Sequence, residues 1–184
     1  MKIFGTFKQS AAELKSLRNV VVTGLLIAVS MVIEAFTINL GFAKINFAFL
    51  AIAAIGMLYG PTVSLFAGGI CDILGYLVAP DGAFFPLYTL IGMAQGLIYG
   101  LIAYRMLVKK TGREGYLETL VRLCIARVFD VLIINLVCNT AANFHYGFLS
   151  DRTLGAAIAA RVLKNVIELP FDLILIALVL QSPH

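Results

Sequence analysis

Charged residues are scarce in this sequence, and their scarcity decides its broad class. Lysine, arginine, aspartate and glutamate make up 13% of the 184 residues, whereas 61% are hydrophobic and the mean hydropathy is +0.97. An apolar excess of this size, spread along the whole chain, is more than a soluble core of the same length can bury. We therefore predict an integral membrane protein.

Several catalytic and energy-coupling motifs are missing as well. The sequence has no Walker A motif, so the chain cannot drive transport with ATP by itself, and it has neither HExxH nor a DxxxD pair to hold a diphosphate through Mg²⁺. The embedded serines, Ser30 and Ser64, have no histidine base in the apolar segments. The three cysteines lack CxxC spacing and are interpreted as small apolar fillers. These absences predict a protein that is not an enzyme and that needs neither a metal nor a cofactor.

A nucleic-acid partner is not indicated either, although the net charge is +4. No basic stripe with interleaved aromatic residues lies outside the apolar segments. The basic residues gather instead before the first apolar stretch, where Lys2, Lys8, Lys15 and Arg18 outnumber Glu13. Such a basic arm predicts that the N-terminus stays in the cytoplasm, with attraction to anionic membrane lipid.

Hydropathy divides the rest of the chain into six segments. About 20 apolar residues cross a bilayer as a helix, and fewer suffice where neighbours shield the segment. The predicted spans are residues 20–39, 47–59, 62–79, 86–107, 117–143 and 154–180. Gly60-Pro61 predicts a tight turn, and so a hairpin, between the second and third spans. We predict an all-α fold in which a cytoplasmic arm, residues 1–19, precedes a single six-helix membrane domain, residues 20–181.

The basic residues of the short connections predict the orientation. The side shared with the N-terminus receives Lys2, Lys8, Lys15, Arg18, Arg105, Lys109, Lys110, Arg113 and Arg122, and the opposite side receives Lys44 and Arg152. Because cytoplasmic loops carry the excess of lysine and arginine, we expect both termini in the cytoplasm. The outer connections are then residues 40–46, 80–85 and 144–153.

Ionisable side chains inside the predicted spans need a partner, a wet cavity or a function, because each costs at least ~2.5 to 3.5 kcal/mol at membrane depth. They are Glu34, Asp72, Arg127, Asp130, Arg161, Lys164, Glu168 and Asp172. Arg127 and Asp130 are three residues apart and are expected to satisfy each other. Glu34 lies near the outer end of the first span and is expected to reach the interface.

The last span has a polar stripe, because Arg161, Lys164, Asn165, Glu168 and Asp172 share one helical face. At 1.5 Å per residue, Arg161 and Lys164 lie roughly 10 and 15 Å below the outer end, within reach of a cavity open to the outside. Lys164 and Glu168 are spaced to pair, which leaves Arg161 as the freer cation. The alternative is a ladder of salt bridges that holds the helices together.

The fifth span carries an amide face. Asn135, Asn139 and Asn143 recur every four residues and are followed by His145 and Tyr146. Asparagine both donates and accepts hydrogen bonds, so this face suits a heterocycle whose edge alternates donors and acceptors. Hydrogen bonding between packed helices is the other interpretation.

Asp72 is the strongest single ligand candidate. It follows Gly68-Gly69, which permits close backbone approach, and its carboxylate can accept two hydrogen bonds from an amino-substituted ring. The alternative is a single cationic partner on a neighbouring helix. Aromatic residues near the outer connections can stack on a flat ligand or anchor the protein at the membrane interface. These are Phe47, Phe49, Phe84, Phe85 and Tyr88.

Six segments, in order, resemble the substrate-specific (S) components of energy-coupling-factor (ECF) transporters, and specifically their folate family. They are FKQSAAELKSLRNVVVTGLLIAVSMV, INFAFLAIAAIGMLYGP, GGICDILG, LIYGL, NTAANFHYG and RVLKNVIELP. The resemblance spans nearly the whole chain. It implies an ECF S-component-like bundle in a bacterial cell membrane that binds folate, or another small heterocyclic vitamin, from outside. It also implies a transmembrane coupling subunit and two ATPase subunits as partners.

The resemblance and the residue patterns together predict a ligand site among the outer connections and the outer halves of the later helices. Its predicted members are Asp72, Asn139, Arg161, Lys164, Asn165, Asn143, Tyr146, Phe85 and Tyr88. The resemblance further places the small-residue motif that docks the coupling subunit at Gly24 and Ala28. A small membrane enzyme or a scaffold with a structural polar core is the competing hypothesis.

Overall fold

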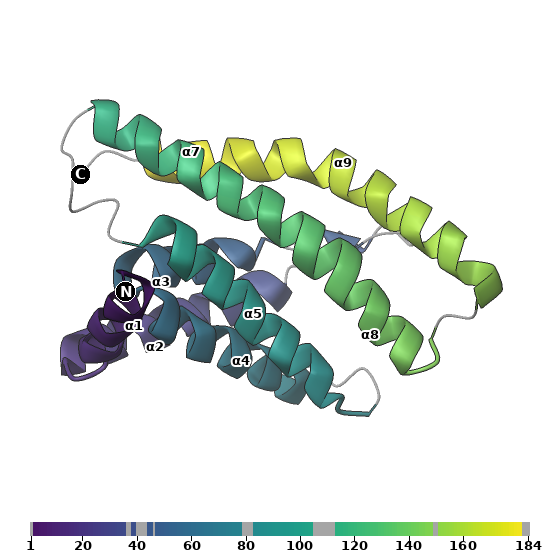
Figure 1. Ribbon diagram of the computed structural model, residues 1–184, viewed down its shortest axis with the longest axis horizontal. Coiled ribbons are helices and arrows are strands. Elements are labelled where there is room, and N and C mark those ends of the chain that lie inside the picture. Colours follow the sequence, from purple (N-terminus) through teal and green to yellow (C-terminus); the bar gives the residue numbers. More distant parts are fainter. Residues whose placement is uncertain are drawn as a thin grey trace.

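The computed structural model describes residues 2–35, 38–39, 44–45, 47–78, 83–104, 113–148 and 151–181, and almost all of them are helical (Figure 1). The helices are α1 (Lys2–Glu13), α2 (Leu17–Ala35), α3 (Phe49–Tyr59), α4 (Pro61–Val78), α5 (Pro86–Ala103), α7 (Arg113–Phe129), the π-helix η1 (Asp130–Cys138), α8 (Asn139–His145) and α9 (Asp151–Gln181). The strands β1 (Ile38–Asn39) and β2 (Lys44–Ile45) pair antiparallel. α7, η1 and α8 follow one another without a break, so each of the six predicted spans overlaps one helical stretch.

The first predicted span is too long at its outer end. We predicted helix through residue 39, but α2 ends at Ala35, and Ile38 and Asn39 pair with Ile45 and Lys44. A helix of 19 residues is already about 28 Å long, close to the thickness of the hydrocarbon layer. The helix can therefore end before residue 39.

α4 and α5 pack backbone against backbone. A Cβ atom added at Gly96 would overlap the carbonyl group of Ser64, and one added at Gly68 would overlap the carbonyl group of Gly92. The Ser64 hydroxyl donates a hydrogen bond to the Gly96 carbonyl oxygen at 2.7 Å. Small residues at such contacts are how membrane helices approach closely.

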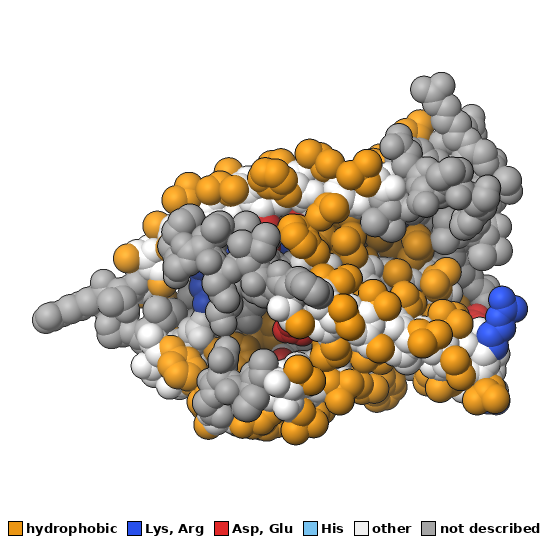
Figure 2. Space-filling view, turned by 180° about the vertical axis from the view of Figure 1, so that it is seen from behind, with side chains coloured by type: hydrophobic (Ala, Val, Ile, Leu, Met, Phe, Trp, Pro, Cys, Tyr) orange, Lys and Arg blue, Asp and Glu red, His pale blue; other side chains and the backbone are white. Residues whose placement is uncertain are grey.

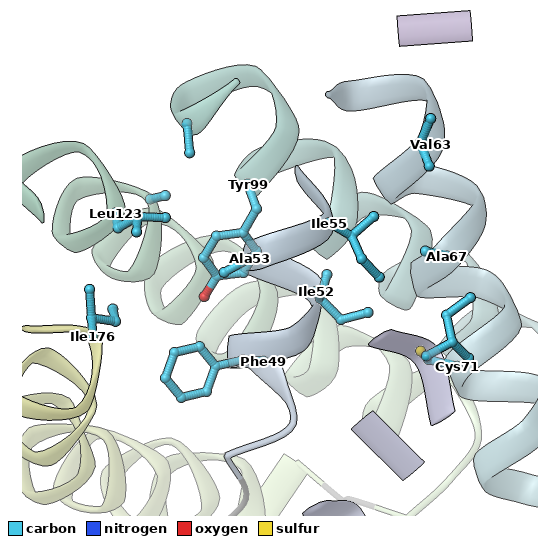
Figure 3. Close-up of a cluster of buried hydrophobic side chains, with 13 residues drawn as sticks. Phe49, Ile52, Ala53, Ile55, Val63, Ala67, Cys71, Tyr99, Leu123 and Ile176 are labelled. Carbon is cyan, nitrogen blue, oxygen red and sulfur yellow. The ribbon is translucent and has the colours of Figure 1, made fainter. Parts of the chain in front are cut away.

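The main hydrophobic core surrounds α3 (Figure 3). Ile55 of α3 and Tyr99 of α5 are fully buried, and Leu123 of α7 and Ile176 of α9 complete the cluster from the other side. Phe49, at the start of α3, lies under the Arg127 guanidinium, 3.9 Å from the ring centroid. The core therefore connects α3, α4 and α5 to α7 and α9.

α1 is tied to the turn between α3 and α4. The buried Ser10 hydroxyl accepts hydrogen bonds from the amides of Thr62 and Val63 at 3.0 and 3.3 Å and donates one to the Tyr59 carbonyl at 2.6 Å. The first amides of a helix have no partner within it, so a side chain from α1 caps α4. Gly60, at φ +84°, makes the turn that brings them together. Residues expected to form a polar arm thus form a docked helix.

Hydrophobic side chains cover much of the surface (Figure 2). Among the described residues, α2, α4 and α5 are long and apolar enough to cross a membrane, and α3 is a shorter apolar helix. Many leucine and valine side chains on α2 and α4 are exposed, such as Leu25, Val32 and Leu77, and soluble monomers rarely expose large contiguous apolar patches. Such a surface is suited to contact with the hydrocarbon layer of a membrane.

Candidate ligand-binding site

One cavity of about 1320 Å³ lies between the two halves of the chain. Its walls come from the last turns of α2, the start of α3, the second half of α4, the first half of α5, η1 with α8, and the first half of α9. These are the helix ends that the sequence predicted at the outer side. Figure 2 shows acidic side chains recessed among hydrophobic ones on one face of the molecule.

The cavity brings together most of the predicted ligand residues. Seven of the nine line it: Asp72, Phe85, Tyr88, Asn139, Asn143, Arg161 and Lys164. The other two, Tyr146 and Asn165, are not among its lining residues. Tyr146 packs on Phe85 with ring centroids 4.3 Å apart, and its hydroxyl accepts a hydrogen bond from the Leu87 amide at 3.3 Å. Asn165 is buried, and its carbonyl oxygen has no hydrogen-bond partner among the described residues.

One wall of the cavity is acidic. Asp72 of α4 accepts a hydrogen bond from the Thr89 hydroxyl at 2.6 Å through Oδ2. This bond holds the carboxylate in place. Glu34 of α2, which we expected at the membrane interface, also lines the cavity. Its carboxylate lies against Gly75, where an added Cβ would be 3.3 Å from Glu34 Oε2. The wall can therefore accept several hydrogen bonds from a donor-rich ligand.

The opposite wall is cationic. Lys164 and Glu168 form the predicted pair, with Nζ and Oε2 3.4 Å apart. Arg161 donates a hydrogen bond from Nη1 to the Asn135 carbonyl oxygen at 3.1 Å and, within the described residues, has no carboxylate partner. The expectation that Arg161 is the freer of the two cations is confirmed. Its remaining N–H groups can bind an anionic part of a ligand.

A buried ion cluster adjoins the cationic wall, and its Arg127 lines the cavity. Arg127 donates to Asp130 Oδ2 from Nη1 at 2.7 Å, which confirms the predicted pair, and also to Asp172 Oδ2 from Nη2 at 2.7 Å. Gln95 and Tyr99 of α5 add hydrogen bonds to Asp130 Oδ2 at 3.1 and 3.4 Å. With Arg127 engaged by two carboxylates, this cluster holds α5, η1 and α9 together.

Aromatic rings form the rim. Phe85 packs against Tyr88, Tyr146 and Phe148, with ring centroids 6.4, 4.3 and 5.4 Å apart. The Tyr88 hydroxyl donates to Asn143 Oδ1 at 2.6 Å, which joins α5 to α8. These rings therefore contribute both to the cavity wall and to the packing between helices.

Sequence reasoning missed Gln95, Tyr76 and Phe148, which also line the cavity. Two of them carried a usable signal. Gln95 is a polar residue in an apolar span and lies two turns after Tyr88, and Tyr76 lies one turn after Asp72, so each shares a helical face with a predicted residue. Phe148 lies in the connection predicted at residues 144–153, where no periodicity applies.

Comparisons with known proteins agree on a vitamin transporter but name two different vitamins. A family profile described as "ECF-type riboflavin transporter, S component" matches residues 14–182. The folate transporter FolT of Clostridium novyi (strain NT) is 29% identical over 133 residues, which cover 72% of this chain and 70% of that protein. FolT of Leuconostoc mesenteroides subsp. mesenteroides is 28% identical over 155 residues, 84% of this chain and 80% of that protein.

The same likeness holds in three dimensions. A crystal structure of FolT bound with folic acid superimposes with a TM-score of 0.75 at 25% identity, over 92% of this chain and 96% of that one. An S component is a substrate-binding part of a transporter, so the prediction that the chain is not an enzyme is confirmed. The chain belongs to the family of ECF transporter S components, which are multi-pass membrane proteins.

Proposed function

We propose that this S component captures folate at the outer face of a bacterial cell membrane and delivers it for ATP-driven uptake by a separate coupling module. In this proposal six helical stretches cross the bilayer, both termini lie in the cytoplasm, and the cavity opens outward. The two FolT relatives and the FolT structure with folic acid support folate as the ligand.

The observation that carries the proposal is the opposite charge of the two cavity walls. Folate has an amino-substituted pterin ring rich in N–H donors at one end and a glutamate with two carboxylates at the other. Asp72, held by Thr89, suits the ring, and Arg161, with Lys164 beside it, suits the glutamate. Phe85 can stack on the flat part between them.

Riboflavin, which the family profile names, is the second candidate. Its ring also presents donors and acceptors, but the molecule carries no charged group at neutral pH. A riboflavin site gains little from a cation without a carboxylate partner, so Arg161 favours folate over riboflavin.

Partner docking is proposed on α2. Gly24 and Ala28 are exposed and one turn apart, and nothing lies within 4 Å of a Cβ added at Gly24. This small-residue surface allows a helix of a transmembrane coupling subunit to pack closely. Two ATPase subunits would complete the transporter.

The deciding experiment identifies the ligand directly. Purified protein is denatured, the released small molecules are identified by mass spectrometry, and a panel of vitamins is then tested by thermal shift. We expect folate to be released and to stabilise the protein, with both effects lost in Asp72→Ala. The assignment of folate would be refuted if riboflavin stabilised the protein and folate did not.

A scaffold role is tested by the double variant Lys164→Met with Glu168→Leu. If the polar stripe serves only to hold the helices together, this apolar pair preserves function. If Lys164 also contacts the ligand, the double variant keeps its thermal stability but binds folate more weakly.

A further inference from the structure

α1 presents one exposed face that the proposed function does not use. Phe4, Lys8 and Ala11 are exposed, and their spacing of four and three residues places them in one row along the helix, while the exposed Lys15 follows in the turn after its end. We propose that this row, called here the α1 face, binds the headgroup layer of an anionic lipid bilayer.

The orientation of α1 is fixed by the protein itself. Ser10, on a different side of the helix, is buried and caps α4 through the amides of Thr62 and Val63. The Thr62 hydroxyl adds a hydrogen bond to the Phe7 carbonyl oxygen at 3.0 Å. With this side held against the bundle, the α1 face points away from the protein in a constant direction.

The composition of the α1 face and its surroundings suits the interface between water and lipid. Phe4 is 84% exposed, and Leu17, at the start of α2, is 79% exposed. Lys8, Lys15 and Arg18 are exposed, whereas the only acid in this stretch, Glu13, is half-buried and accepts a hydrogen bond from Asn19 at 2.8 Å. Exposed apolar side chains among cations are typical of helices that lie on anionic membranes.

The position of α1 along the chain argues for a bilayer as the occupant. α1 ends at Glu13 and α2 begins at Leu17, so three residues separate it from a helix long and apolar enough to cross a membrane. α1 must therefore lie at the level where that helix leaves the lipid. Lysine side chains can extend along apolar surface to phosphate groups at this level, while Phe4 inserts among the acyl chains.

The absence of tryptophan allows a direct test in the full-length protein. Phe4→Trp introduces a single tryptophan, because the sequence has none, and Gln9→Trp places one at an exposed position about 140° around the same helix as the matched control. Each variant is reconstituted in nanodiscs of phosphatidylcholine, alone or mixed with phosphatidylglycerol. Tryptophan emission and its quenching by brominated acyl chains are then measured at low and high salt.

We expect emission from Phe4→Trp to be blue-shifted and quenched by brominated lipid in the anionic nanodiscs, and less so in phosphatidylcholine or at high salt. Gln9→Trp should emit as a water-exposed tryptophan throughout. Adding Lys8→Gln, Lys15→Gln and Arg18→Gln to Phe4→Trp should remove the difference between the two lipids.

Three outcomes would overturn the proposal. The first is water-like emission from Phe4→Trp in both lipids, and the second is an identical blue shift in both lipids at every salt concentration. The third is a blue shift that arises only after a coupling subunit is added, which would make a protein the occupant. A thermal shift of each variant shows that the fold is intact, so a negative result cannot be assigned to misfolding.

Discussion

Arg161→Ala should weaken folate binding strongly without unfolding the protein. Arg161 is half-buried on the cavity wall, and its one hydrogen bond among the described residues goes to the Asn135 carbonyl oxygen. No buried carboxylate there depends on it, so its removal leaves no uncompensated charge. Lys164 differs in this respect, because its loss would leave the buried Glu168 without its cation.

The magnitude follows from the interaction that is lost. A hydrogen bond to a charged group contributes roughly 1.5 to 3 kcal/mol, and about 1.4 kcal/mol corresponds to tenfold in affinity. Arg161→Ala should therefore raise the folate dissociation constant about 10- to 150-fold. Titration calorimetry on the detergent-solubilised protein measures this change.

The ligand provides the control. A folate in which both glutamate carboxylates are converted to amides keeps its ring but loses its anionic end. Its affinity should be lower than that of folate for the unaltered protein and nearly the same for Arg161→Ala. An equal loss for both ligands, or no loss for folate, would refute the assignment of Arg161 to the glutamate.

Three further predictions concern stability and are measured by thermal or chemical unfolding in detergent. Arg127→Met leaves two buried carboxylates without their cation and should cost about 3 to 5 kcal/mol, whereas Asp130→Asn leaves a balanced pair and should cost clearly less; equal losses would contradict this charge count. Gly96→Ala forces α4 and α5 apart and should cost about 1 to 3 kcal/mol, whereas Gly24→Ala, in open space, should be neutral, and a neutral Gly96→Ala would show that the helices can separate. Ser10→Ala removes the cap of α4 and should cost about 0.5 to 2 kcal/mol, with Ala12→Ser, on the exposed side of α1, as the neutral control.

Much of the fold could be predicted because the bilayer imposes simple rules. Long apolar segments separated by polar connections give the helices directly, and Gly60-Pro61 gives the α3–α4 turn. α1 was not predicted as a helix, since its stability comes from contacts of Ser10 with residues about 50 positions away. No local pattern reports such a contact.

The site was predictable where helical periodicity governs and less so where it does not. The i, i+4 spacing gave the Lys164–Glu168 pair, and polar residues in apolar spans gave Asp72 and Arg161. We predicted the amide face by assuming an α-helix. Asn135 lies instead in the π-helix η1, whose hydrogen bonds span one residue more per turn. Of that face, Asn143 is bonded to Tyr88, as the helix-packing interpretation expects, and also lines the cavity.

The most consequential contact that sequence could not give is the one between Arg127 and Asp172, 45 residues apart. It determines which cations a ligand can meet. Arg127 is engaged by two carboxylates and Lys164 by one, so among the described residues of this wall Arg161 is left with a carbonyl oxygen alone. Because a cation half-buried in a membrane protein is costly without an anion, we expect the anion for Arg161 to arrive with the ligand. The buried cluster thereby supports the assignment of the site, and its Arg127 and Gln95 also line the cavity.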